Sequence, residues 1–403
     1  MRSLSITITL VITVAAVLAF LAAQELVRST DELEQNVVPV LITSQGLVAS
    51  LAEADAANTS VFLSGADEDR QQRRLYELAV ERAPRQIEDV SALIGDDAAA
   101  HDALKDVGSG LTAYVATVEQ ARAANLAGDP DATAELAEAI NLMNGSDGML
   151  NAVEAVTTQA SSSFDTVDDS ADVLVLLALI AIVVALGALV FGQVWLQRTT
   201  NRTINPPMAL ATLLLLGLEI WIIGAYLGRA SDLDTAQVNA SDAIFTTSSV
   251  QTRAFELKTG IESDLIGTSS LSAADRQAAI DDVRADIETL FVGADNQREL
   301  AAAKELEIRF DRYAATADAI AADVNAGRID EAVSRSVGDG NRDFNGFNTA
   351  VESVLSDNRD QFFDTASSAR GRLNWLRLGT ILIPIIAAGL ALWGWQVRID
   401  EYW

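Results

Sequence analysis

Four apolar stretches interrupt an otherwise polar chain, at residues 4–23, 173–196, 208–227 and 378–395. A helix rises about 1.5 Å per residue, so about 20 residues cross a hydrocarbon core of about 30 Å. The pattern predicts a multi-pass protein of the plasma membrane with four transmembrane helices, for which membrane lipid is one partner. The first stretch is expected to remain as an anchor, because Leu21-Ala22-Ala23 is a poor signal-peptide cleavage site.

The short turn at residues 197–207 indicates how these helices are oriented. Arg198 and Arg202 are its only charged residues, and short basic loops tend to stay in the cytoplasm. With this turn inside, both termini and the tail at residues 396–403 are cytoplasmic. The long segments 24–172 and 228–377 are then extracytoplasmic.

Both long segments have the pattern of helical bundles. Ala, Glu, Gln, Arg and Leu dominate, and no alternation of period two indicates a strand. Glycine-containing breaks divide each segment into four predicted helices, which favours an antiparallel four-helix bundle. The first and last helix of each segment are expected to continue into the adjacent span.

The two halves of the chain resemble each other at an offset of about 200 residues. Matching features recur in the same order: Tyr114-Val115-Ala116-Thr117 with Tyr313-Ala314-Ala315-Thr316, Gly128 with Gly327, and Phe164-Asp165-Thr166 with Phe363-Asp364-Thr365. Each half then consists of a transmembrane span, a helical bundle and a second span, and both halves have the same orientation in the membrane. The predicted fold is an all-α membrane protein with four transmembrane helices and two extracytoplasmic four-helix bundles in a tandem (parallel) repeat.

The charge of the chain narrows the range of partners. Its formal net charge is −29, and it contains no Cys and one His. Residues 24–172 have 8 basic and 28 acidic residues, a net of −20, and residues 228–377 have 16 and 26, a net of −10. Nucleic acid is excluded as a partner because phosphate binding needs positive charge. Disulfides and thiolate chemistry are excluded by the lack of Cys.

Candidate chemistry in the long segments is sparse. His101 is the single histidine, and no phosphate-binding loop, zinc pattern or catalytic triad is present. We therefore expect no enzymatic activity, no metal and no cofactor. The basic run with Arg70, Arg73 and Arg74 allows two interpretations. It either contacts an anionic ligand or forms a solvated helix face with pairs spaced four residues apart.

Glu219 is the one ionisable residue in the middle of a predicted span. A carboxyl group there is unfavourable unless it is protonated, paired or hydrated. One interpretation is a neutral carboxyl that hydrogen-bonds a neighbouring helix. The other is a conformational latch or proton-sensitive contact, and the sequence does not separate the two.

The cytoplasmic parts predicted by this topology are too short to fold into an output domain. If the protein signals, a separate chain has to dock on the turn and the tail. The candidate contact residues are Arg198, Arg202, Asn205, Arg398, Asp400, Glu401 and Tyr402. For the aromatic end of the tail, a position at the lipid interface is the alternative.

The topology, the Asn205-Pro206-Pro207 turn and the tail with Arg398 and Glu401-Tyr402 resemble a known family. It is the four-span transmembrane component of the actinobacterial glutamate/aspartate-sensing pathway. The resemblance implies two partners: an extracytoplasmic glutamine/glutamate-binding lipoprotein of the solute-binding type, and the cytoplasmic Ser/Thr protein kinase G. Each bundle also resembles the four-helix sensor domain of bacterial chemoreceptors.

These features predict a non-enzymatic signal transducer that relays the ligand state of the lipoprotein to the kinase. A direct sensor of an amino acid or dicarboxylate, of chemoreceptor type, is an alternative. A third possibility is an envelope scaffold or transporter accessory protein. The sequence leaves open whether the chain forms a homo-oligomer.

Overall fold

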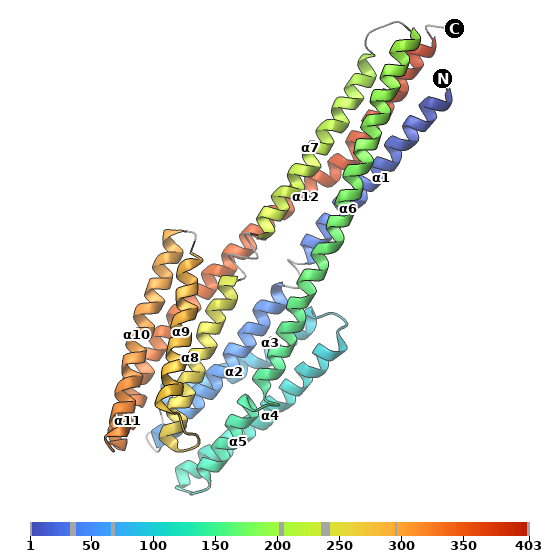
Figure 1. Ribbon diagram of the computed structural model, residues 1–403. Helices are drawn as coiled ribbons and strands as arrows, with labels where there is room; N and C mark the ends of the chain where they lie inside the picture. Colours follow the sequence, from blue (N-terminus) through green and yellow to red (C-terminus); the bar gives the residue numbers. More distant parts are fainter. Residues whose placement is uncertain are drawn as a thin grey trace. The chain divides into compact units, whose positions relative to one another are not determined.

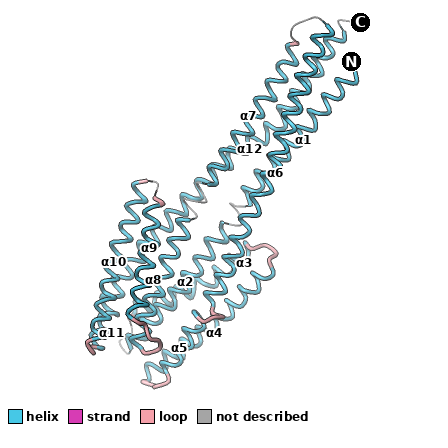
Figure 2. The backbone as a smooth tube through the Cα atoms, viewed as in Figure 1, coloured by secondary structure: helices cyan, strands magenta, loops and turns pink. Residues whose placement is uncertain are grey.

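A computed structural model describes residues 2–32, 38–65, 69–200, 205–234, 242–294 and 296–400. All regular elements in these ranges are helices (Figures 1 and 2), which confirms the predicted all-α membrane fold. They are α1 (Arg2–Glu32), α2 (Val38–Ser64), α3 (Arg70–Leu93), α4 (Ala98–Ala127), α5 (Ala132–Asn144), α6 (Met149–Thr200), α7 (Pro206–Asp234), α8 (Asp242–Ile266), α9 (Ala273–Val292), α10 (Gln297–Asn325), α11 (Ile329–Arg335), the π-helical turn η4 (Ser336–Gly340) and α12 (Asn341–Asp400).

The chain divides into two compact units. One, here the apolar unit, comprises Met1–Gln35, Ser163–Ala236 and Phe363–Trp403. The other, the polar unit, comprises a first half, Asn36–Ser162, and a second half, Gln237–Phe362. The two segments predicted as bundles thus pack together in one unit, a contact that sequence reasoning did not predict.

The apolar unit contains four helices that are long and apolar enough to cross a membrane: Ile6–Arg28, Val173–Arg198, Pro206–Gly228 and Leu378–Val397. Each of these segments has one packed face and one exposed face. In α1, for example, Ile8, Ile12, Ala15 and Ala19 are buried, whereas the exposed residues are Ile6, Leu10, Val14, Val17 and Leu21. Small residues on the packed faces let helices approach closely, and the large exposed ones suit contact with lipid.

Tryptophans in the apolar unit have two different environments. Trp375 and Trp393 are exposed, as expected for side chains at a membrane interface. Trp395 is instead buried in the core of the unit, although it is the next residue but one after Trp393. Its ring lies 6.1 Å from that of Trp195, between α12 and α6. Packing between helices therefore determines the position of Trp395.

In the polar unit, α2 is the central helix. It packs against α3, α4, α5, α8 and η4, and every residue from Ser50 to Val61 is buried. A helix surrounded on all sides has no solvent face, so its polar residues must find partners inside the protein. These residues include Glu53, Asp55 and Ser60.

The order of helices in the first half recurs in the second. In both halves a long first helix ends at a glycine with positive φ, Gly65 after α2 and Gly267 after α8. The fourth helix then differs: α5 ends before the break at residues 145–148, whereas α11 continues through η4 into α12. Gly65 and Gly267 supply a common reference for comparing positions in α2 and α8.

Two helices belong to both units. α6 runs without a break over 52 residues and α12 over 60 residues, with Pro384 inside it. This confirms the predicted continuity for the last helix of each segment. The corresponding junctions of α1 with α2 and of α7 with α8 fall at residues 33–37 and 235–241, outside the described residues.

Candidate functional site

The two halves of the polar unit meet where α2 packs against α8. Ser60 lies five residues before Gly65, and Glu262 lies five residues before Gly267, so the two occupy equivalent positions. The Ser60 hydroxyl donates to the Glu262 carboxylate at 2.7 Å. Contact between equivalent positions is typical of an isologous, two-fold interface. One chain thus forms internally the kind of contact that two copies of a half would form.

A buried ion pair lies at this contact. The Lys258 ammonium is 2.6 Å from Glu262 Oε1, one helical turn away in α8, and both side chains are almost fully buried. Lys258 also donates to the Ser60 hydroxyl, and its ammonium lies 5.8 Å from the centre of the Phe344 ring. Because water does not reach these side chains, each charge is stabilised by the opposite charge and by the Ser60 hydroxyl of α2.

Hydrogen bonds connect this ion pair to the beginning of α12. Ser336, the first residue of η4, donates to Glu262 Oε1 at 3.3 Å. The Ser60 hydroxyl, which contacts both charges, also lies 3.3 Å from Oδ1 of Asn341, the first residue of α12. Single-turn π segments are frequent at functional sites. The helix that leads into the apolar unit thus begins beside the buried charges.

Burial also changes acidity near the ion pair. It lowers the pKa of Lys258, although the neighbouring Glu262 acts in the opposite direction. Burial, with the Glu262 charge as a second cause, raises the pKa of Tyr313 well above its usual value. Glu262 thus favours the charged form of Lys258, against the effect of burial.

A second buried carboxyl, that of Asp55, lies on another face of α2. Asn144 of α5 donates to Asp55 Oδ2 at 2.8 Å, and the Tyr114 hydroxyl of α4 is a second hydrogen-bonding neighbour of the Asp55 carboxyl. Burial raises the pKa of Asp55 to about 7, against the opposing effects of the Asn144 and Tyr114 hydrogen bonds. Burial and the nearby Asp55 charge also raise the pKa of Tyr114 well above its usual value.

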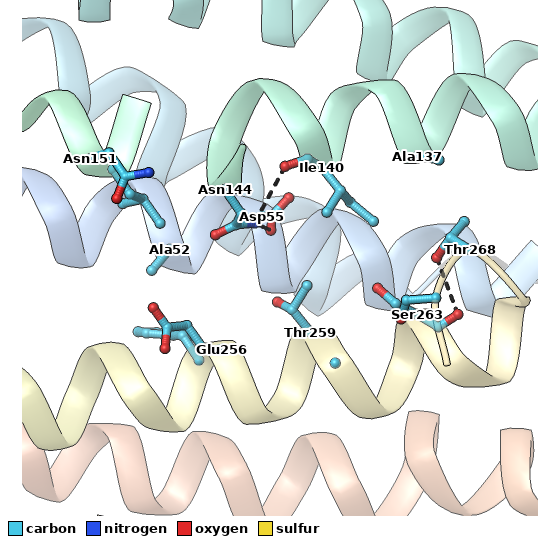
Figure 3. Close-up of a pocket in the computed structure, with 14 residues that line it drawn as sticks. Ala52, Asp55, Ala137, Ile140, Asn144, Asn151, Glu256, Thr259, Ser263 and Thr268 are labelled. Carbon is cyan, nitrogen blue, oxygen red and sulfur yellow. Dashed lines mark hydrogen bonds between the residues drawn. The ribbon is translucent and has the colours of Figure 1, made fainter. Parts of the chain in front are cut away.

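Asp55 lines a cavity of about 380 Å³ between the two halves. In Figure 3, Asp55 and Asn144 lie across the cavity from Thr259 and Ser263 of α8. Glu256 also lines it, and none of its fourteen lining residues is Lys, Arg or His. Among the described residues, no group of three or more His, Asp or Glu is arranged to hold a metal ion. The arrangement can therefore offer hydrogen bonds and negative charge to a small ligand.

The basic run predicted as a weak ligand contact lies at the start of α3. Arg70 and Arg74 are exposed, and Arg73 pairs with Glu77 at 2.8 Å and with Glu119 of α4 at 2.9 Å. The Arg73–Glu77 pair has the four-residue spacing that the sequence predicts for a solvated helix face, whereas the other pair with this spacing, Asp69 with Arg73, is not formed by the side chains in the described residues. The Asp69 carboxylate instead accepts from the backbone N–H of Gln71 and caps α3. None of the three arginines lines the cavity between the halves.

His101, the single histidine of the chain, has hydrogen-bonding neighbours in the structure. Its Nδ1 lies 3.1 Å from the Ser91 hydroxyl, and its Nε2 lies 2.8 Å from the carbonyl oxygen of Gly95. The ring therefore joins the end of α3 to the start of α4. This arrangement gives His101 a structural role in the turn between the two helices.

Glu219, the intramembrane carboxyl, lies in α7 and is half-buried. Its neighbours in sequence, Leu218 and Ile222, belong to the core of the apolar unit. No hydrogen bond or ion pair joins Glu219 to another residue in the described part of the chain. Neither of the two interpretations of Glu219 is favoured by these surroundings.

The predicted cytoplasmic contact residues lie partly within the described chain. Arg198 is exposed in the last turn of α6. The Asn205 amide donates to the carbonyl oxygen of Gly394 at 2.9 Å and so ties the start of α7 to α12. Arg398 and Asp400 belong to the end of α12. Arg202, Glu401 and Tyr402 lie outside the described residues.

Sequence reasoning missed the residues at the contact of α2 with α8. Lys258 and Glu262 have the spacing of an ordinary surface pair, and the run from Ala52 to Ser60 has polar residues that suit a solvated helix. One signal was available: Lys258 is one of only three lysines in the chain, with Lys105 and Lys304. The rarity of lysine alone does not indicate that Lys258 is buried, because the sequence does not show that α8 packs against α2.

Comparison with known proteins places the chain in a broad class. The family model of an actinobacterial sensor domain matches residues 29–169, which include α2 to α5 and the beginning of α6. Together with four apolar helices, this match fits a multi-pass membrane sensor of actinobacterial type and indicates a role in sensing or signalling. Neither the curated proteins nor the solved structures gave a match.

Proposed function

We propose that this protein is a non-enzymatic transmembrane signal transducer. In this proposal the polar unit is extracytoplasmic and docks an amino-acid-binding lipoprotein, and the two cytoplasmic segments dock a Ser/Thr protein kinase. The lipoprotein acts through differential affinity for two arrangements of the helices, since a ligand can shift an equilibrium only by that difference. The change then reaches the cytoplasmic side through α6 and α12.

The observation that carries the proposal is the continuity of these two helices. Each connects one half of the polar unit with a candidate membrane span without a break. The match to a sensor domain over residues 29–169 supports a sensing role for the first half. Because α12 begins beside the buried Lys258–Glu262 pair, a change at the contact of α2 with α8 has a direct connection to a span.

Breaking α6 is expected to uncouple sensing from output. Proline inside a helix removes a backbone hydrogen bond and clashes with the preceding turn, at about 3 kcal/mol or more. In cells, Ser162→Pro in α6 should abolish the response of kinase substrate phosphorylation to the amino acid, and Ser162→Ala should preserve it. An unchanged response in Ser162→Pro, with the variant present at normal levels in the membrane, would argue against transmission through α6.

Crosslinking tests the two partners separately. A photoreactive residue is placed at exposed positions of the polar unit, namely Leu78, Leu126, Val292, Leu300 and Ile329, and at Val397 near the end of α12. We expect the lipoprotein to be captured from the polar unit and the kinase from Val397. Leu213, exposed on a candidate span, is the control that should capture neither. Capture of neither protein at any test position would overturn the proposal.

A further inference from the structure

The π-helical turn η4 brings two buried polar residues to the same side of the chain. Ser336 and Asn341 are five positions apart, so in a regular α-helix, with about 100° per residue, they would point about 140° apart. In a π turn the backbone hydrogen bond spans five residues instead of four, and here the Asn341 N–H donates to the Ser336 carbonyl oxygen. The two side chains therefore lie one turn apart on one face, and both are buried.

Both side chains contact the network around the buried ion pair. The Ser336 hydroxyl donates to Glu262 Oε1 at 3.3 Å, and Asn341 Oδ1 lies 3.3 Å from the Ser60 hydroxyl. In a regular α-helix Gly340, which has no side chain, would take the place of Asn341 one turn after Ser336. One of the two contacts would then be lost. The network thus favours the π-helical register over the α-helical one.

The glycines of η4 leave the turn free to change register. Gly338 is exposed, and a Cβ added to it would meet no other atom of the described chain within 4 Å. Its φ is not positive, so neither a close contact nor a left-handed backbone requires glycine at this position. Gly338 and Gly340 both weaken the preference for any one helical conformation. The contacts of Ser336 and Asn341, rather than the turn itself, therefore determine the register.

The sequence of α11 suits a second register. α11 has only seven residues, whereas α12 is held by aromatic contacts with α8 and α10. If η4 becomes α-helical while α12 stays in place, each residue of α11 moves to the place of the residue before it, a rotation of about 100° and a shift of about 1.5 Å. Val333 and Val337, now half-buried, then take the buried places of Ala332 and Ser336. The core keeps apolar side chains in both registers.

The first half has a related contact at the corresponding place. α5, the counterpart of α11, ends at Asn144, whose amide donates to the buried Asp55 of α2. In the second half Ser336, directly after α11, donates to the buried Glu262 of α8. In both halves the residue that contacts the buried acid is followed by a segment that is not α-helical, the break at residues 145–148 or η4. This junction is thus tied to the first helix of each half.

We propose that η4 is a register switch that couples α11 to the contact between the two halves. While Ser60 and Glu262 hold Asn341 and Ser336, η4 is π-helical. When α2 and α8 separate, the turn becomes α-helical and α11 rotates. Because coupling is reciprocal, a partner that binds α11 in one register also shifts the contact between the halves. The switch goes beyond the proposed relay, and its test needs neither the lipoprotein nor the kinase.

Thiol labelling of the full chain in lipid nanodiscs measures the register. The chain has no Cys, so one introduced cysteine is the only thiol. Ala332→Cys lies at a fully buried position and should react slowly with a maleimide. Adding Ser336→Ala and Asn341→Ala removes both contacts, so Ala332→Cys should then react at least tenfold faster. Val333→Cys should react more slowly in the same background, because it moves into the core, whereas unfolding would accelerate both.

Two controls separate a change of register from a general loosening. Ala317→Cys, at an equally buried position of α10, should react slowly with and without the alanine substitutions. Deleting Gly338 places Ser336 and Asn341 four positions apart, so an α-helical turn keeps both contacts and leaves no second register. In the shortened chain the alanine substitutions should no longer accelerate the reaction of Ala332→Cys.

Three outcomes would overturn the proposal. In the first, the alanine substitutions leave the rate of Ala332→Cys unchanged, which means that the two contacts do not hold the register. In the second, Ala332→Cys, Val333→Cys and Ala317→Cys all react faster, which means that the second half loosens as a whole. In the third, the alanine substitutions accelerate Ala332→Cys as strongly after deletion of Gly338, so that the π turn is not the moving part.

Discussion

Replacing Lys258 with methionine is expected to lower the free energy of unfolding of the polar unit by about 3–5 kcal/mol, the usual effect of removing one partner of a buried ion pair. Lys258→Met leaves the Glu262 carboxylate buried with only the Ser60 and Ser336 hydroxyls as hydrogen-bonding neighbours. A buried charge without its partner is the cause of this loss.

The apparent melting temperature of the full chain in nanodiscs measures this effect. For a unit of this size the expected decrease is about 6–20 °C. Lys304→Met makes the same substitution at an exposed position of α10, where we expect little change. Equal melting temperatures for the Lys258 and Lys304 variants would show that the buried pair does not stabilise the contact of α2 with α8.

A double-mutant cycle separates the charges from the contact itself. In Lys258→Met with Glu262→Met, no unpaired charge remains buried, and apolar replacement of a buried pair is often close to neutral. The double variant should therefore recover most of the stability that Lys258→Met loses. If the double variant is as stable as the unchanged chain but no longer gives a signalling response, the ion pair is needed for signalling and not for folding.

Asparagine at position 55 is expected to stabilise the protein at pH 8 and to leave it nearly unchanged at pH 4. The pKa of Asp55 is 3.8 in its ordinary state and is raised to about 7 by burial. The folded chain therefore binds this proton more strongly than the unfolded chain, so the contribution of Asp55 to stability is present below about pH 4 and is lost as pH rises through 7. At 1.36 kcal/mol per pH unit this contribution is about 4 kcal/mol.

The measured quantity is the difference in melting temperature between Asp55→Asn and the unchanged chain across this pH range. We expect the difference to grow in favour of the variant as pH rises, because the asparagine amide oxygen can still accept from Asn144. Asp106→Asn makes the same substitution at an exposed position of α4 and is the control. A constant difference for Asp55→Asn would mean that the Asp55 carboxyl is not desolvated in solution.

The membrane helices and the helical character of the rest could be predicted because both are local properties of the chain. Length and apolar composition determine whether a segment such as 173–196 suits a membrane, and helix-forming residues with glycine breaks determine where helices end. The candidate spans in the structure begin and end within a few residues of the predicted ones. It also showed that Trp395 is buried, which the sequence does not reveal because it does not show which face of α12 meets α6.

What the sequence by itself determined is the all-α membrane fold, the repeated order of helices and the continuity of α6, where no Gly or Pro lies between Val153 and Ala178. Only the tertiary structure decided that the two halves share one unit and that α2 is its central helix. A helical pattern gives the spacing of polar residues but not what packs against them, so Asp55, Ser60 and Lys258 look like solvated residues until α8 lies against α2. Burial between the halves, which is a property of residues about 200 positions apart, turns these ordinary side chains into the candidate site.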